Sequence, residues 1–180
     1  MRLSLRAVQA PAQIQTPRML SERIGPRHHA LLLALLGDPR VGATLGGTAT
    51  AGDVTAYIGR EVARWSADGM GYWMFRSRAT GAGVARGGLS RTRVGGLDEI
   101  EIGWAVMPGR WGQGYATELG AAAIDVAFGV FGALSVVAYT LPHNVGSRRV
   151  MEKLGFSYER EVVYAGLPHV LYRLQPPCSR

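Results

Sequence analysis

A glycine-rich turn between an apolar strand and a helix has the composition of a pyrophosphate-binding site. The strand that contains Glu101 ends at Pro108 and Gly109, and the turn that follows contains Gly112 and Gly114. Backbone N–H groups at a helix start have no partner within the helix, so they bind anions well. Glycine lets a phosphate approach the main chain where a Cβ atom would block it.

The spacing of the turn excludes two common phosphate-binding loops. A dinucleotide fold needs Gly-x-Gly-x-x-Gly and an acidic residue about 20 positions later. Thr117 occupies the third glycine position, and the next expected strand, Leu134 to Thr140, has no carboxylate. The Gly-Lys-Ser/Thr sequence of a nucleoside triphosphatase loop is also absent.

A second motif, about 30 residues further on, narrows the interpretation. It reads Asn-Val-Gly-Ser-Arg-Arg-Val-Met-Glu-Lys-Leu-Gly-Phe and predicts a short helix that begins at Asn144 and is stopped by Gly155. Together with Trp-Gly-Gln-Gly-Tyr-Ala in the turn, it resembles the GNAT superfamily of acetyl-CoA-dependent N-acetyltransferases. Glu-Ile-Gly-Trp before the turn and Gly-Tyr-Ala-Thr-Glu after it are similar to the RimJ/RimL branch, named for enzymes that acetylate ribosomal protein N-termini. The resemblance extends from about Thr16 to Leu174 and is specific from Glu99 to Phe156.

The resemblance implies acetyl-CoA as the cofactor and places its binding site around the turn. Main-chain amides are expected to bind most of the pyrophosphate. The superfamily usually opens the six-residue loop with glutamine or arginine, whereas this chain has Trp111 there and Arg110 one place earlier. The expected cofactor-binding residues are Val106, Met107, Trp111, Gly112, Gln113, Gly114, Tyr115, Ala116, Thr117, Asn144 and Ser147.

Acetyl transfer to an amine also needs a group that accepts the amine proton. The resemblance assigns this role to a carboxylate on the strand before the turn, and Glu101 matches that position. Its side chain leaves the strand on the face opposite Ile100 and Ile102. Glu99 shares that face and is the alternative, and both carboxylates could also be ordinary solvent-facing strand residues.

The departing thiolate is expected to receive its proton from Ser147. Many GNAT enzymes have a tyrosine seven residues after the asparagine, but Met151 occupies that position and cannot donate a proton. Asn144, Ser147 and Met151 share one stripe of the predicted helix, and the RimJ/RimL branch is thought to use the serine. A serine bonded to the helix backbone is the alternative. No spacing of histidine, cysteine and aspartate predicts a metal site.

The elements that position these residues predict an α/β domain. A strand, helix, strand, helix order in the middle of the chain implies a parallel pair inside a mixed sheet. The resemblance implies the GNAT fold, a mixed and mostly antiparallel sheet with a central parallel strand pair flanked by helices. A flexible tail is expected over residues 1–15 and a single N-acetyltransferase domain over residues 16–175. We expect strands at 17–24, 72–78, 83–91, 99–107, 134–140, 157–164 and 169–174, helices at 26–36, 53–67, 114–131 and 144–154, and turns or bends at Gly81, Gly87, Gly88, Gly95 and Gly96.

The composition agrees with one cytoplasmic domain. The chain has 180 residues, of which 47% are hydrophobic, and a single cysteine that excludes an internal disulfide. The strongest apolar run, Ala30 to Leu36, is far shorter than the ~18 residues of a membrane span, and the first 13 residues lack a signal-peptide pattern. The net charge of +7 either attracts an anionic cofactor or partner or reflects coding bias. Nucleic acid is not an expected partner, because the arginines are scattered without interleaved aromatic residues.

The sequence therefore predicts direct transfer of acetyl from acetyl-CoA to a primary amine, without an acyl-enzyme. A protein N-terminal α-amine is the favoured acceptor, because with a pKa of about 7.8 it is roughly one-tenth neutral at pH 7, compared with about 1 in 2,500 for lysine. The alternatives are a small-molecule amine as acceptor, or a non-catalytic acyl-CoA-binding regulatory module. No membrane partner is expected, and the oligomeric state, a homodimer included, stays open.

Overall fold

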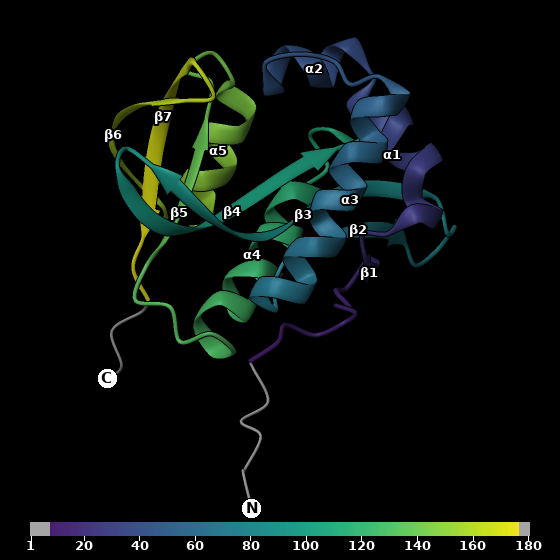
Figure 1. The fold of residues 1–180 in the computed structure, drawn as a ribbon, viewed down its shortest axis with the longest axis horizontal. Coiled ribbons are helices and arrows are strands. Elements are labelled where there is room, and N and C mark those ends of the chain that lie inside the picture. Colours follow the sequence, from purple (N-terminus) through teal and green to yellow (C-terminus); the bar gives the residue numbers. More distant parts are fainter. Residues whose placement is uncertain (1–7, 177–180) are drawn as a thin grey trace, which may run out of the picture.

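The computed structural model describes residues 8–176, which form one mixed seven-stranded sheet covered by helices (Figure 1). Neighbouring strands are antiparallel except for β4 and β5, which run parallel at the centre. The predicted fold class, with its central parallel pair, is therefore confirmed. In spatial order the strands are β1 (Met19–Arg23), β2 (Tyr72–Ser77), β3 (Gly83–Val94), β4 (Leu97–Val106), β5 (Val136–Thr140), β7 (Leu167–Leu174) and β6 (Ser157–Tyr164).

Helices pack on both faces of the sheet because side chains alternate along its strands. On β2, Tyr72 and Met74 pack with the helices that precede it in the chain, whereas Trp73 and Phe75 pack with those that follow β4. None of the helices of residues 8–176 is long and apolar enough to span a bilayer. The α-helices of the described chain are α1 (His29–Leu36), α2 (Pro39–Leu45), α3 (Ala51–Asp68), α4 (Tyr115–Gly129) and α5 (Val145–Lys153).

Helix α2 was not expected from the sequence, although both of its ends carry recognisable signals. The side chain of Asp38 caps the helix by accepting a hydrogen bond from the backbone N–H of Arg40, and Pro39 occupies the first turn. Gly46 ends the helix with a positive φ of 84°. Its short length explains why the pattern reads as a loop.

Two of the glycines that were expected at turns lie inside a strand instead. Gly95 and Gly96 do form the two-residue turn between β3 and β4, with φ values of 57° and 85°. Gly87 and Gly88, by contrast, lie in the middle of β3. A Cβ atom at Gly88 would come within 2.3 Å of the carbonyl oxygen of Gly71, so glycine is needed there for close packing rather than for a bend.

The predicted tail extends too far into the domain. Residues 1–7 lie outside the described part of the chain, but Ala10 and Ile14 pack against the core on one face of the sheet. Ala10 is buried and its N–H donates to the carbonyl of Gly69 at 2.8 Å. The buried indole of Trp73 donates to the carbonyl of Pro11 at 3.1 Å. These contacts anchor the segment that leads into β1.

Candidate active site

The two parallel strands separate and open a cavity between them. β4 and β5 are paired at one register position, Glu101 opposite Val137, and diverge beyond it (Figure 1). A cavity of about 720 Å³ is lined by the ends of both strands, by the turn after β4, by the start of α5 and by α2. The divergence therefore brings every motif that the sequence singled out to the edge of one opening.

The glycine turn has the backbone geometry expected of an anion site. Gly112 and Gly114 have φ values of 72° and 80°, a region that favours glycine. α4 begins directly after Gly114 without a side-chain cap. The amides of residues 112–117 make no hydrogen bond with any group of residues 8–176, and a Cβ atom at Gly112 would meet open space. Unpaired amides at a helix start fit the pyrophosphate of coenzyme A.

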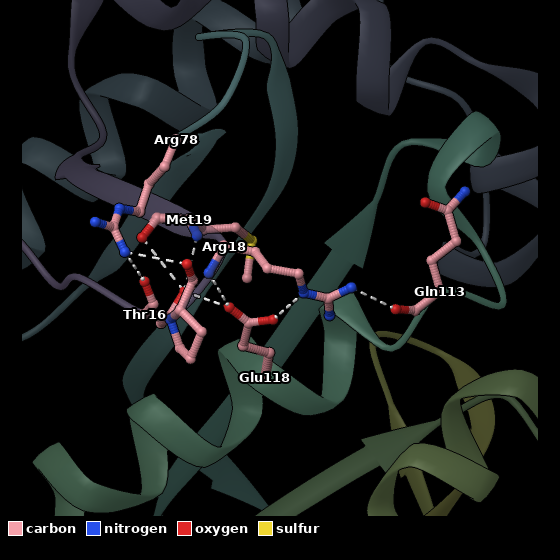
Figure 2. Close-up of polar contacts among 7 residues, drawn as sticks. Thr16, Arg18, Met19, Arg78, Gln113 and Glu118 are labelled. Carbon is pink, nitrogen blue, oxygen red and sulfur yellow. Dashed lines mark hydrogen bonds and ion pairs between the residues drawn. The ribbon is translucent and has the colours of Figure 1, made fainter.

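An ion pair ties this turn to the N-terminal edge of the sheet. In the first turn of α4, Glu118 accepts hydrogen bonds from the hydroxyl of Thr16 at 2.6 Å and from the backbone and Nε of Arg18 at 2.9 and 2.6 Å. The same guanidinium donates to the carbonyl of Gln113 at 2.8 Å (Figure 2). It also lies over the ring of Tyr115, 4.1 Å from the ring centre. Burial opposes ionisation of Glu118, but these hydrogen bonds outweigh it and keep its pKa below the ordinary value.

Most of the expected cofactor-binding residues line the cavity. Trp111, which departs from the superfamily pattern, donates its indole N–H to the carbonyl of Val106 at 2.7 Å and so closes the end of β4. Met107 packs in the core between the sheet and the first helices, and Gln113 donates its side-chain amide to the carbonyl of Gly109. These two are not among the lining residues. Those that line the cavity are Val106, Trp111, Gly112, Gly114, Tyr115, Ala116, Thr117, Asn144 and Ser147.

The two candidate carboxylates occupy different environments. Glu101 lines the cavity and accepts a hydrogen bond from Ser90 at 2.8 Å. Burial raises the pKa of Glu101, while the hydrogen bond from Ser90 and the charge of Arg86 oppose the rise. Glu99 lies away from the cavity lining and accepts two hydrogen bonds from Arg173, at 2.6 and 3.1 Å. Of the two carboxylates, only Glu101 lines the cavity.

Ser147 also lines the cavity and lies in the first turn of α5. Asn144 begins this helix by accepting a hydrogen bond from the N–H of Ser147 at 3.1 Å, and it donates to Thr140 at 2.9 Å. The hydroxyl of Ser147 makes no hydrogen bond within residues 8–176, so it is not held by the helix backbone. Met151 is 1% exposed and belongs to the core.

Sequence reasoning missed several polar side chains around Glu101. Ser90 stands opposite Glu101 in the antiparallel register of β3 and β4, and Tyr72, Arg86 and Tyr139 also line the cavity. Burial and the nearby charge of Glu101 raise the pKa of Tyr139. These residues come together only through the pairing of neighbouring strands, and no local sequence pattern predicts which residues of two strands will be paired. No group of three or more potential metal ligands is found among residues 8–176.

The diverging parallel strands and the uncapped helix start define an acyl-CoA-dependent transferase. The sequence model of the family described as Acetyltransferase (GNAT) domain matches residues 18–157, so the chain belongs to this family. The protein is an acetyl-CoA-dependent N-acetyltransferase, and coenzyme A is its acyl carrier.

Proteins of known sequence and structure agree with this assignment. YkkB, an uncharacterized protein of Bacillus subtilis (strain 168), is 25% identical over 164 residues, which cover 91% of this chain and 95% of YkkB. The crystal structure of an acetyltransferase from Agrobacterium tumefaciens str. C58 superimposes with a TM-score of 0.81 at 22% identity, covering 98% of this chain and 100% of that one.

Two further structures with this fold bear names that state an acceptor. Ribosomal-protein-S5-alanine acetyltransferase from Vibrio fischeri has a TM-score of 0.74 at 14% identity and covers 92% of this chain and 97% of its own. AAC(6')-Ib in complex with ribostamycin and coenzyme A has a TM-score of 0.72 at 17% identity, and the match covers 87% of this chain and 93% of that one. At these identities the likeness establishes the fold and not the acceptor.

The free amides of the turn lead to a first prediction. Gly112→Glu should reduce acetyl-CoA affinity at least about tenfold, because a carboxylate would meet the space intended for a phosphate. Gly132→Glu is the matched control, since Gly132 also has a positive φ, of 59°, and open space around its Cβ position, but lies after α4 away from the cavity. Isothermal calorimetry on both folded variants measures the effect. Equal affinities in the two variants would remove the turn from the cofactor site.

Proposed function

We propose that this acetyltransferase acts on the α-amine of a protein N-terminus, and that it belongs to the RimJ/RimL-like branch of the family. Glu101 accepts the amine proton, and Ser147 donates a proton to the leaving sulfur. The observation that carries this proposal is that Glu101 and Ser147 line the same cavity as the residues of the glycine turn. A cytoplasmic setting belongs to the same proposal.

The environment of Glu101 suits the removal of a proton from an amine. A general base works best when its pKa lies near the working pH, and burial moves the pKa of Glu101 in that direction. The hydroxyl of Ser90 and the charge of Arg86 favour the ionised carboxylate and so keep it able to accept a proton. The carboxylate of Glu99 is less suited to accept the amine proton, because it already accepts two hydrogen bonds from Arg173.

Bound acetyl-CoA supplies the acetyl group as an activated thioester. The chain's own groups then hold and move protons: the amides of residues 112–117 bind the phosphates, Glu101 takes the proton from the attacking nitrogen, and Ser147 gives one to sulfur. The free thiol of coenzyme A has a pKa of about 8.5, so a hydroxyl donor assists its departure without being obligatory.

The charge of the cavity favours an N-terminal α-amine over a polycationic acceptor such as an aminoglycoside. Its lining contains a single carboxylate, Glu101, but four basic side chains, Arg86, Arg110, Arg149 and Lys153. These cations attract the phosphates of the cofactor and repel a polyamine. An α-amine carries one charge at most and is partly neutral at pH 7.

A panel of acceptors tests the proposed function. Release of coenzyme A thiol should be fastest with short peptides that have free N-termini, slower with lysine side chains in N-terminally blocked peptides, and slowest with aminoglycosides. Faster turnover of aminoglycosides or polyamines would assign the enzyme to small-molecule acceptors. Acetyl-CoA binding without turnover of any acceptor would favour the alternative of a regulatory module.

The role of Glu101 predicts a change in the pH profile. Glu101→Gln keeps the shape but removes the base, so the loss of kcat/KM should be largest between the raised pKa of Glu101 and the amine pKa of about 7.8, where the parent carboxylate is ionised and the amine still carries its proton. The rate should recover partly above that range. Glu99→Gln serves as control and should keep the parental profile. A Glu101→Gln profile parallel to the parent's at every pH contradicts the role.

The role of Ser147 predicts a loss in turnover rather than in cofactor binding. Ser147→Ala should lower kcat by about 10²- to 10⁴-fold if proton donation to sulfur matters, with a smaller change in acetyl-CoA affinity. Ser147→Thr retains the hydroxyl and should restore much of the rate. Steady-state kinetics on both variants provide the measurement. If Ser147→Ala turns over within about twofold of the parent, water protonates the thiolate and the enzyme uses no side-chain acid.

A further inference from the structure

The side chain of Arg86 is a cation in the cavity without an anionic partner. Arg86 projects from β3, is half-buried and lines the cavity together with Glu101 and Tyr72. Its Nε is fully enclosed and has no hydrogen-bond partner in residues 8–176. The guanidinium also forms no salt bridge with the carboxylates of that part of the chain.

Aromatic rings fix the position of this guanidinium but leave its N–H groups free. Its central carbon lies 4.9 Å from the ring centre of Tyr72 and 5.6 Å from that of Tyr57. Contacts with ring faces stabilise the charge without using the N–H donors. The two carboxylates nearby are engaged elsewhere: Glu61 pairs with Arg64 and accepts from the N–H of Tyr72, and Glu101 accepts from Ser90.

Tyr72 also connects Arg86 with the proposed base. A Cβ atom built on Gly103 would lie 1.9 Å from the hydroxyl of Tyr72 and 3.2 Å from Oε1 of Glu101, so both oxygens approach the same point of the cavity wall. The ring of the same tyrosine faces Arg86. A free guanidinium and the carboxylate that receives the amine proton are therefore neighbours around one ring.

The unpaired, enclosed Nε is energetically costly, and the two terminal nitrogens are neither enclosed nor hydrogen-bonded within residues 8–176, so they are free to donate to a ligand in the cavity. The planar fork of the guanidinium suits a carbonyl or carboxylate oxygen.

We propose that Arg86 binds the carbonyl or carboxylate oxygen adjacent to the acceptor amine, so that the site recognises an α-aminoacyl head group rather than an amine alone. The inference rests on the proposed function, because Glu101 marks where the amine binds. Two sources share this chemistry. A peptide N-terminus offers a carbonyl oxygen, and a free amino acid offers a full carboxylate.

Three acceptors and two variants test the inference. Alanyl-alanine amide carries the carbonyl, free alanine carries the carboxylate, and isopropylamine has the same carbon frame with neither. Arg86→Met keeps the apolar stem of the side chain and removes its donors, and Arg86→Lys keeps the charge without the fork. Each kcat/KM is divided by the parent value for the same acceptor, which cancels the differences in amine pKa.

Arg86→Met should lower kcat/KM for the dipeptide amide at least about tenfold more than for isopropylamine, mainly through KM, whereas the loss shared by all acceptors reports the support that Arg86 gives to the ionised Glu101. For the dipeptide amide, the kcat/KM of Arg86→Lys should lie between those of the parent and Arg86→Met. A larger loss of kcat/KM with free alanine than with the dipeptide amide would show that Arg86 binds a free carboxylate rather than a peptide carbonyl. An equal loss with all three acceptors would overturn the inference and leave Arg86 a structural residue.

The parent enzyme provides a readout that does not depend on folding of the variants. After correction for the neutral fraction of each amine, it should prefer an α-aminoacyl acceptor to isopropylamine at least about tenfold. Parent activity on all three acceptors without this preference refutes the recognition by Arg86 and leaves the proposed function intact. Absence of thiol release with every acceptor refutes the proposed function itself.

Discussion

The candidate active site exists because two parallel strands of the sheet separate after one shared position. β4 and β5 are in register only at Glu101 and Val137. Beyond that point the facing peptide groups of the two strands cannot satisfy each other, and the sheet opens into a cavity. Each strand leads into a helix, α4 after Gly114 and α5 after Asn144, and both helix starts line the same opening. Ligands of open α/β sheets bind at the carboxyl ends of strands in this way.

The glycine turn depends on a contact from the far end of the sequence. A solvent-exposed ion pair contributes little to stability by itself, about 0–1 kcal/mol. Glu118, however, accepts three hydrogen bonds from Thr16 and Arg18, and Arg18 reaches on to the carbonyl of Gln113 (Figure 2). This network positions the first turn of α4 while leaving the amides of the glycine turn free. The segment before β1 is thus part of the architecture of the cofactor site.

The sequence could predict what is local and could not predict what depends on strand register. The strand, glycine turn and helix around Gly112, and the capped helix at Asn144, follow from neighbours within a few residues. Thr16 and Arg18 meet Glu118 across about 100 positions, and Ser90 meets Glu101 only through the pairing of β3 and β4. The prediction of a turn or bend at Gly88 was wrong, because a glycine required by close packing looks the same in sequence as one required by a bend.

The position of Glu101 at the apex of the divergence suits the proposed proton transfer. A carboxylate deeper between the paired strands would hold its proton at neutral pH, because burial without compensation penalises the charged form. One farther out would be solvated, with an ordinary pKa about three units below that of an α-amine. At the apex, burial raises the pKa of Glu101, while Ser90 and Arg86 limit the rise. Narrowing the gap between the two pKa values makes the proton transfer less unfavourable, and Ser90 and Arg86 favour the ionised carboxylate that accepts the proton. β4 and β5 are paired at Glu101, and at this position burial raises the pKa of the carboxylate while Ser90 and Arg86 still favour its ionised form.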